Sequence, residues 1–226
     1  MTGPRVPLVT GGLGAILLAG GRATRVDGAT KPLFEIDGRT LLRTAVEAAT
    51  DAAAGPITVV APMLDDSLEV RWVREDPPFG GPAAGIVAAL ESWADGDQPE
   101  WTLVLACDLP RADAAVRRLV DDIVLLPADA DGVCLGDASS TPQWLTGVYR
   151  TRALRAAASA LPDRGRDAAV RALVDDLAIT VLTVADDLTR DVDTWEDLEQ
   201  ARSAAPPYSA TRDTGQTADR RAEEPS

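Results

Sequence analysis

Short apolar runs alternate with amphipathic segments along most of this chain, and the two patterns predict different elements. A continuous apolar run bounded by turn residues is typical of a strand buried on both faces, whereas apolar positions three and four residues apart mark one face of a helix. The apolar runs predict strands over 15–18, 57–61, 70–74, 102–106, 132–135, 144–149 and 179–183. The periodic segments predict helices over 40–53, 82–93, 111–124, 151–160, 166–177 and 194–201.

This alternation predicts the fold class and the limits of the domain. Strands that are apolar throughout and separated by helices indicate an α/β fold, in which a mostly parallel sheet is covered by helices on both faces. Residues 13–202 carry the pattern and form one predicted domain. Residues 1–12 contain Pro and Gly without periodicity and are predicted to be a flexible leader. Residues 203–226 are rich in Ala, Pro, Ser, Thr and charge and are predicted to be a disordered tail.

Composition narrows the classes of function. The 226 residues are 46% apolar, which is enough for a full core, and their net charge of −14 disfavours nucleic acids and anionic membranes as partners. The chain has no histidine, so any bound metal is expected to be a hard cation on oxygen ligands, such as Mg²⁺. A signal-peptide pattern and an apolar run of membrane-spanning length are both lacking, which predicts a cytoplasmic protein.

The single lysine of the chain lies in a glycine-containing segment directly after the first predicted strand. Of 22 basic residues, 21 are arginine and one is Lys31. Glycines expose backbone N–H groups that can cradle phosphate oxygens, and a lysine ammonium reaches a phosphate as a flexible point charge. The segment over 18–32 therefore predicts a triphosphate-binding loop, with an ordinary turn of solvated charges as the alternative.

Two further features fall at the carboxyl ends of predicted strands. Gly80-Gly81-Pro82 precedes the helix over 82–93, and Asp108 follows the strand over 102–106. Ligands of open α/β sheets bind outside the carboxyl ends of the strands, so these features converge with the glycine loop. Asp108 is a candidate Mg²⁺ ligand or, alternatively, the N-cap of the next helix.

Other polar and aromatic residues have a structural interpretation beside a functional one. Asp193 is a candidate second metal ligand, and the alternative is that Asp193 or Thr194 caps the last helix. Glu75 and Asp76 are candidates to hydrogen-bond a base edge or a ribose hydroxyl, and for Glu75 a solvated loop charge is the favoured interpretation. Tyr149 is interpreted as a core or rim residue.

In their order and spacing, these motifs resemble the nucleotidyltransferase family typified by the molybdenum cofactor guanylyltransferase. The resemblance covers about residues 14–201. It rests on L-A-G-G-x-x-x-R-x-x-x-x-x-K at 18–31, G-P-x-x-G at 81–85, C-D-x-P at 107–110 and x-V-[ND]-T-x-E-D-L at 191–198. Val26-Asp27 departs from the Met-Gly that the family usually has after its loop arginine.

The resemblance implies a Rossmann-like three-layer α/β/α fold and Mg²⁺-dependent transfer of GMP from GTP to molybdopterin, with release of pyrophosphate. The residues that it implies for nucleotide binding are Leu18, Ala19, Gly20, Gly21, Lys31, Asp76, Gly81 and Asp108. The implied catalytic residues are Arg25, Lys31 and Asp108, and the implied Mg²⁺ ligands are Asp108 and Asp193.

Two alternatives stay open at this point. One keeps the enzyme class and changes the nucleotide or the acceptor, as in a cytidylyltransferase for the same cofactor or an enzyme acting on a sugar phosphate. The other is a non-catalytic nucleotide-binding protein of the same fold.

Overall fold

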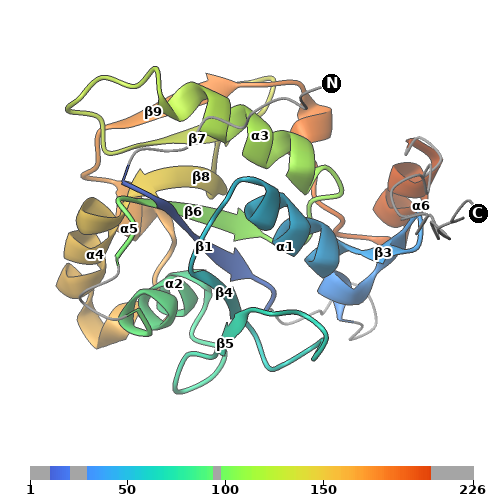
Figure 1. Ribbon diagram of the computed structural model, residues 1–226, viewed down its shortest axis with the longest axis horizontal. Coiled ribbons are helices and arrows are strands. Elements are labelled where there is room, and N and C mark those ends of the chain that lie inside the picture. The colour runs from blue at the N-terminus through green and yellow to red at the C-terminus, as the bar shows by residue number, and fades with distance from the viewer. Residues whose placement is uncertain (1–10, 21–29, 94–97, 205–226) are drawn as a thin grey trace, which may run out of the picture.

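A seven-stranded sheet forms the centre of the computed structural model, which describes residues 11–20, 30–93 and 98–204 (Figure 1). The strand order is β5-β4-β1-β6-β8-β7-β9, and every neighbouring pair is parallel except the two pairs made by β8. The strands are β1 (Leu13–Leu18), β4 (Ile57–Val60), β5 (Arg71–Val73), β6 (Trp101–Ala106), β7 (Gly132–Gly136), β8 (Pro142–Arg150) and β9 (Ile179–Thr183). The predicted mostly parallel sheet is confirmed.

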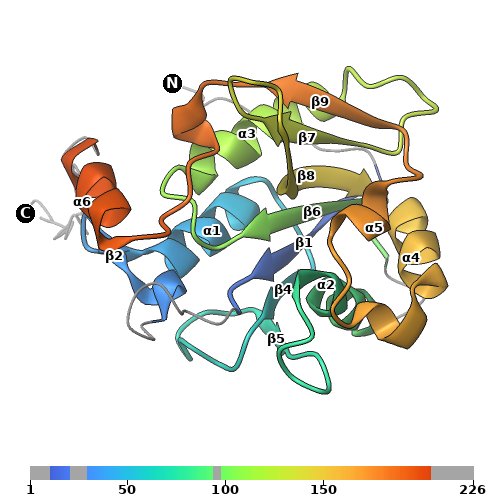
Figure 2. The same cartoon turned by 180° about the vertical axis from the view of Figure 1, so that it is seen from behind.

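Helices cover both faces of this sheet (Figures 1 and 2). One face carries α1 (Leu41–Asp51) and α3 (Ala112–Ile123), and the other carries α2 (Pro82–Glu91), α4 (Thr151–Ala160) and α5 (Arg171–Val174). At the periphery, α6 (Trp195–Ala204) lies beside a separate hairpin of β2 (Glu35–Ile36) and β3 (Arg39–Thr40). The short 3-10 turns are η1 (Lys31–Leu33), η2 (Pro162–Gly165) and η3 (Asp186–Leu188). The predicted three-layer α/β/α arrangement is confirmed.

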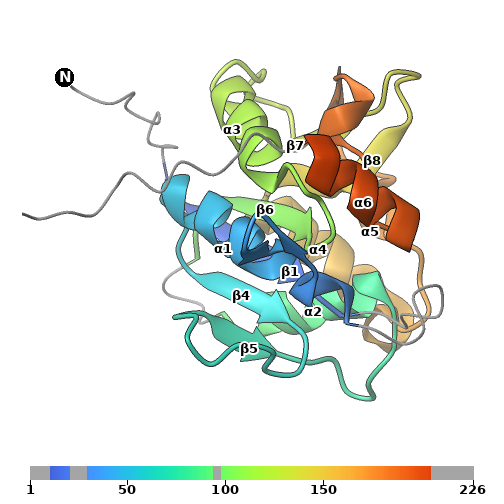
Figure 3. The ribbon, with the colours of Figure 1, turned by 90° about the vertical axis from the view of Figure 1, so that its right-hand side faces the viewer.

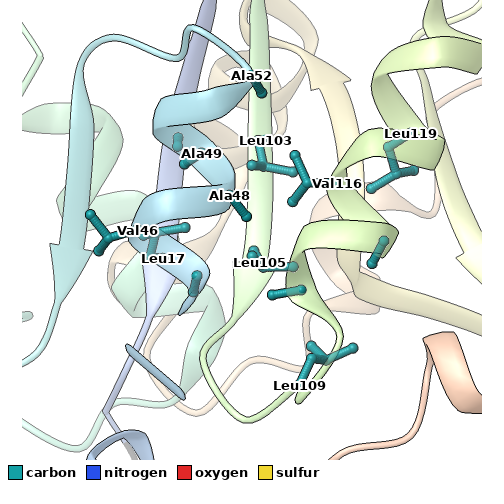
Figure 4. Packing of buried hydrophobic residues seen from close by; sticks show 14 of the residues in the cluster. Leu17, Val46, Ala48, Ala49, Ala52, Leu103, Leu105, Leu109, Val116 and Leu119 are labelled. Atoms are coloured by element: carbon teal, nitrogen blue, oxygen red, sulfur yellow. The ribbon is translucent and has the colours of Figure 1, made fainter. Parts of the chain in front are cut away.

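The continuous apolar character of the central strands follows from this double coverage. Successive residues of a strand point to opposite faces, so a strand covered on both sides needs apolar residues at every position. In β1, Leu17 joins the cluster under α1 and α3, whereas its neighbour Ile16 joins the cluster under α2 and α4. Figure 4 shows the first cluster, with Leu103 of β6 close to Val116 of α3.

The strand order reverses at β1. This reversal locates the edge of the sheet at which a ligand is expected to bind, called the ligand edge below. From β1 the chain builds β4 and β5 on one side and then crosses to β6 on the other. Leu18 pairs in register with Val60 of β4 and Ala106 of β6, so the three strands end together. Figure 3 views the molecule from this edge. Ligand sites of open α/β sheets lie outside such an edge at the point of reversal.

The helix predicted over 166–177 is wrong in its extent, because only residues 171–174 are α-helical. Asp167 adopts a left-handed backbone (φ 56°), which interrupts a helix, and its N–H donates to the Gly80 carbonyl at 2.7 Å. The apolar periodicity nevertheless marked the correct buried face, since Leu173 is 1% exposed.

Smaller differences concern the ends of elements. Between the first predicted strand and the first predicted helix, residues 31–33 form η1 and residues 35–36 form a short strand. The last helix runs to Ala204 rather than to the predicted 201. The predicted leader and tail fall largely outside the described residues. Within the described ranges, no helix combines the length and apolar character that crossing a membrane requires.

Thr40, the first residue of the helix predicted over 40–53, caps α1, and its removal tests how much the cap contributes. The Thr40 hydroxyl oxygen accepts the Arg43 N–H at 3.1 Å. We expect Thr40→Ala to lower the free energy of unfolding by about 1 kcal/mol, measured by urea denaturation, because a donor of the first turn loses its partner. Thr40→Ser keeps the oxygen and is expected to stay near wild type. Equal stability of the Ala and Ser variants would contradict the cap.

Candidate active site

A pocket of about 390 Å³ opens at the carboxyl ends of β1, β4 and β6. Its walls come from these strands, from β8 and from the segment between β5 and α2. The lining residues are Leu18, Gly20, Val60, Glu75, Phe79, Gly81, Pro82, Gly85, Ala106, Asp108 and Leu145. The features predicted to converge on one edge of the sheet, namely the first part of the glycine loop, the Gly81-Pro82 turn and Asp108, therefore do share one cavity.

Two glycines of the G-P-x-x-G motif line the pocket. Gly81 is the N-cap of α2 and has φ 90°, a left-handed backbone that favours glycine over any residue with a side chain. Gly85 lies one helical turn later, and a Cβ atom there would come within 2.9 Å of Val60 Cγ1. Glycine at position 85 therefore allows α2 to pack directly on the end of β4.

The first loop is described only as far as Gly20. Leu18 and Gly20 line the pocket, as predicted, whereas the side chain of Ala19 joins the core cluster under α1. The predicted phosphate contacts Gly21 and Arg25 lie outside the described residues.

Lys31 forms an ion pair with a residue of the last motif in the chain. Its Nζ lies 2.5 Å from Oδ1 of Asp193, and the two side chains are 18% and 40% exposed. The residues are 162 positions apart, so the ion pair joins the end of the glycine loop to the segment before α6. The structure thus brings together the two charged residues that the sequence assigned to phosphate and metal.

A backbone hydrogen bond places this late segment against Asp108. The N–H of Val192 donates to the Asp108 carbonyl oxygen at 2.9 Å, and the Val192 side chain is fully buried. Asp191 and Asp193, on either side of Val192 in sequence, both act electrostatically on the Asp108 carboxylate. Three carboxylates and one ammonium therefore form a single charged cluster.

Burial and charge repulsion both act on the protons of this cluster. Burial, followed by repulsion from Asp191, raises the pKa of Asp108 to about 6, against the opposing attraction of Lys31. Burial and the neighbouring Asp193 also raise the pKa of Asp191. A cation beyond Lys31 would relieve this repulsion.

The capping alternatives for these aspartates are resolved by the helix termini. Arg111 is the N-cap of α3 and no side chain bonds that terminus, so Asp108 does not cap the helix. Thr194 is the residue that caps α6: its hydroxyl accepts the Asp197 N–H at 3.2 Å, and the Asp197 carboxylate accepts the Thr194 N–H at 2.8 Å. This reciprocal arrangement leaves the Asp193 side chain directed at Lys31.

One acidic residue of the site was not identified from the sequence, and a second was considered only as an alternative. Asp191 belongs to the charged cluster, and its alternation with buried Val192 was a usable signal, since residues two apart in an extended segment share a face. Glu75 lines the main pocket and accepts the Phe79 N–H at 2.9 Å, whereas Asp76 lines a smaller hollow beside it. Glu75 was interpreted as solvated, and a nucleoside contact of Asp76 stays a prediction.

The aromatic residue interpreted as core is confirmed as such. Tyr149 is 1% exposed, and its hydroxyl donates to the Trp144 carbonyl oxygen at 2.8 Å. Neither residue lines the pocket.

The donor set of the cluster fits a hard divalent cation that keeps other ligands. Its oxygens come from aspartate carboxylates, which suit Mg²⁺. Among the described residues no group of three or more acidic, histidine or cysteine side chains is arranged to enclose a metal. One or two carboxylates with substrate phosphates and water is the ligand set that Mg²⁺ usually takes, so Asp108 with Asp193 or Asp191 would suffice.

Comparison with known proteins identifies relatives of this chain. Residues 15–178 match the model of the MobA-like NTP transferase domain. A probable molybdenum cofactor guanylyltransferase of Synechococcus elongatus is 36% identical over 148 residues, which are 60% of this chain and 71% of the relative.

Solved structures share the fold at lower identity. Molybdopterin-guanine dinucleotide biosynthesis protein A of Archaeoglobus fulgidus superposes with a TM-score of 0.61 at 18% identity, over 84% of this chain and 96% of that one. The 2-C-methyl-D-erythritol 4-phosphate cytidylyltransferase of Thermus thermophilus gives 0.60 at 17% identity, over 85% and 98%. At these identities the likeness establishes the fold.

The raised pKa of Asp108 predicts how the stability of the metal-free protein changes with pH. The folded state holds the proton up to about pH 6, against an ordinary pKa of 3.8, so deprotonation between these values destabilises the fold. We expect Asp108→Asn to be more stable than wild type near neutral pH and to lose less stability across that interval. Urea denaturation in a metal chelator at several pH values measures both, and a residual slope from Asp191 is expected.

Asp137→Asn is the control of opposite sign. Hydrogen bonds from Ser139 and Thr141 lower the pKa of Asp137, so its charge stabilises the fold above that pKa. This variant is expected to gain no stability near neutral pH. A gain in Asp137→Asn equal to that in Asp108→Asn would mean that net charge, not the site, sets the effect.

Proposed function

Because this chain belongs to the MobA-like NTP transferase family, and is therefore a nucleotidyltransferase, we propose that it transfers GMP from GTP to the terminal phosphate of molybdopterin and releases pyrophosphate. The observation that carries the proposal is the Lys31–Asp193 ion pair, which acts electrostatically on Asp108, a residue that lines the 390 Å³ pocket. The pocket supplies room for a nucleoside, and the charged cluster supplies a place for phosphates. The names of the relatives support guanylyl transfer in particular.

The proposed reaction is a single displacement at phosphorus. An oxygen of the molybdopterin phosphate forms a bond to the α-phosphorus of GTP, and the bond from that phosphorus to the α–β bridging oxygen breaks. Pyrophosphate leaves with the electron pair. The attacking phosphate oxygen carries no proton that must be removed first, which agrees with the lack of histidine in the chain. Positioning and charge neutralisation therefore carry the catalysis.

Each residue of the cluster has a distinct part in this scheme. Lys31 neutralises charge on the triphosphate, and Asp193 holds the ammonium in place before substrate binds. Gly20, with Gly21 and Arg25 of the same loop, would hold further phosphate oxygens through N–H groups and a guanidinium. Asp108 would hold Mg²⁺, with Asp193 or Asp191 as the second carboxylate. When bound, Mg²⁺ supplies positive charge that stabilises the transferring phosphoryl group.

The nucleoside end of the pocket contains one carboxylate, that of Glu75. Hydrogen-bond donors on the edge of guanine match a carboxylate, and so does the amino group of cytosine. A cytidylyltransferase is therefore the second candidate, and the shared fold of the Thermus thermophilus cytidylyltransferase agrees with it.

Pyrophosphate release tests the proposal directly. Each of the four nucleoside triphosphates is supplied with Mg²⁺, with and without molybdopterin. Release that requires both GTP and molybdopterin supports the proposal. Release with CTP selects the cytidylyltransferase, and binding of nucleotide without release under any condition would contradict catalysis.

Removing either charge of the cluster is expected to slow the reaction strongly. We expect Lys31→Ala and Asp108→Ala each to lower turnover by well over tenfold, because charge stabilisation in the transition state is lost. Asp175→Ala, which removes an exposed carboxylate paired with Arg171 in α5, is the matched control and is expected to keep wild-type turnover. Near-normal turnover in either site variant would contradict the role given to that residue.

A further inference from the structure

A large aromatic residue follows the charged cluster closely in sequence and is only half buried. Trp195 begins α6, two positions after Asp193, and is 49% exposed. Val192 and Leu198, which flank it in the same segment, are 0% and 1% exposed. An aromatic residue that served only to pack α6 would be expected to follow its neighbours into the core.

The indole is held in a fixed position. One side of it stacks on Phe34, with ring centroids 4.9 Å apart and planes inclined by 29°. Phe34 directly follows η1, the turn that begins with Lys31, and is itself 8% exposed. The reciprocal cap between Thr194 and Asp197 fixes the backbone at the start of α6. A rigid aromatic ring loses little conformational freedom when a ligand binds against it.

The position of Trp195 separates it from the nucleoside. The 390 Å³ pocket is lined by strands β1, β4, β6 and β8 and by the approach to α2, and no residue of α6 contributes to it. Figures 1 and 3 both show α6 beside the β2–β3 hairpin, at the other side of the ligand edge from β5. The charged cluster connects these two regions. Asp193, two positions before Trp195, pairs with Lys31, and both residues act electrostatically on Asp108 in the pocket.

We propose that Trp195 is a stacking platform for the planar ring system of the acceptor, an inference that rests on the proposed function. A phosphate that reacts at the cluster brings its own ring system close by, and the nucleoside pocket is already taken. Aromatic side chains bind flat heterocycles through their faces, and tryptophan is enriched where ligands and partners are recognised. Leu33, which precedes Phe34 in the chain, is also an exposed apolar residue, with 38% of its surface accessible. Trp195 thereby sets which acceptors are accepted, whereas Lys31 and Asp108 act on any phosphate.

The test separates ring stacking from simple packing by three variants of one position. Trp195→Leu keeps apolar contact with Phe34 but has no flat ring, Trp195→Phe restores a smaller ring, and Trp195→Ala removes both. We expect Trp195→Leu to raise the KM for molybdopterin by about tenfold, with recovery in Trp195→Phe and little change in the KM for GTP. Leu125→Ala, at an apolar residue 75% exposed beyond the end of α3, is the control expected to change neither.

A second measurement does not depend on turnover. Neopterin monophosphate, a pterin that carries a phosphate, is titrated into wild-type protein while tryptophan fluorescence is followed. We expect quenching that is saturable in wild type and is reduced severalfold in Trp195→Leu. A chemical denaturation curve of each variant shows whether α6 is still folded on the hairpin.

The outcomes distinguish this inference from the proposed function. If wild type turns over and Trp195→Leu has an unchanged KM for molybdopterin, the platform is overturned and the function stands. If wild type does not turn over molybdopterin, the function is overturned, and the fluorescence titration alone decides the platform. Quenching that is equal in wild type and Trp195→Leu overturns it.

Discussion

The hydrogen bond from the Val192 N–H to the Asp108 carbonyl is the constraint on which the site depends. Asp108 is placed by the sheet, because it follows β6 directly at the switch point. Asp193 lies outside the sheet, in the loop that leads to α6. The bond, with the burial of the Val192 side chain, fixes this loop against the end of β6. Lys31 can then pair with Asp193. The end of the glycine loop, the end of β6 and the segment before α6 thus carry charges that act on one another.

Such a cluster is held together by the fold against its own repulsion. Burial, and then repulsion from the neighbouring carboxylates, raises the pKa of Asp108 and of Asp191, so the charged state is unfavourable before any further cation arrives. Burial of the large apolar clusters on both faces of the sheet stabilises the fold and offsets the repulsion within the charged cluster. Charged residues that destabilise the fold in this way are typical of functional sites.

The sequence alone predicted the elements and residues for which the local pattern agrees with the global fold. Apolar runs identified the strands because a sheet covered on both faces needs apolar residues at every position. Lys31, Asp108 and Asp193 were recognisable because motif spacing fixes their places relative to strand and helix ends. By contrast, the left-handed Asp167 is held by the distant Gly80 carbonyl, and no local pattern predicts a tertiary bond of that kind. The place of Glu75 in the pocket was likewise not predictable, since it follows from how the loop before α2 folds back. Predictions about residues 21–29 stay predictions.

The single lysine has a practical consequence beyond catalysis. Arginine supplies every other cationic side chain, and guanidinium groups do not react as amines do at neutral pH. Acylating reagents, reductive alkylation and enzymatic acetylation therefore have one side-chain target, and that target is the ammonium paired with Asp193. In most proteins the extent of lysine modification is an average over many surface positions. Here modification reports on a single side-chain amine, so protection of the Lys31 ε-amine would indicate directly that the candidate site is occupied.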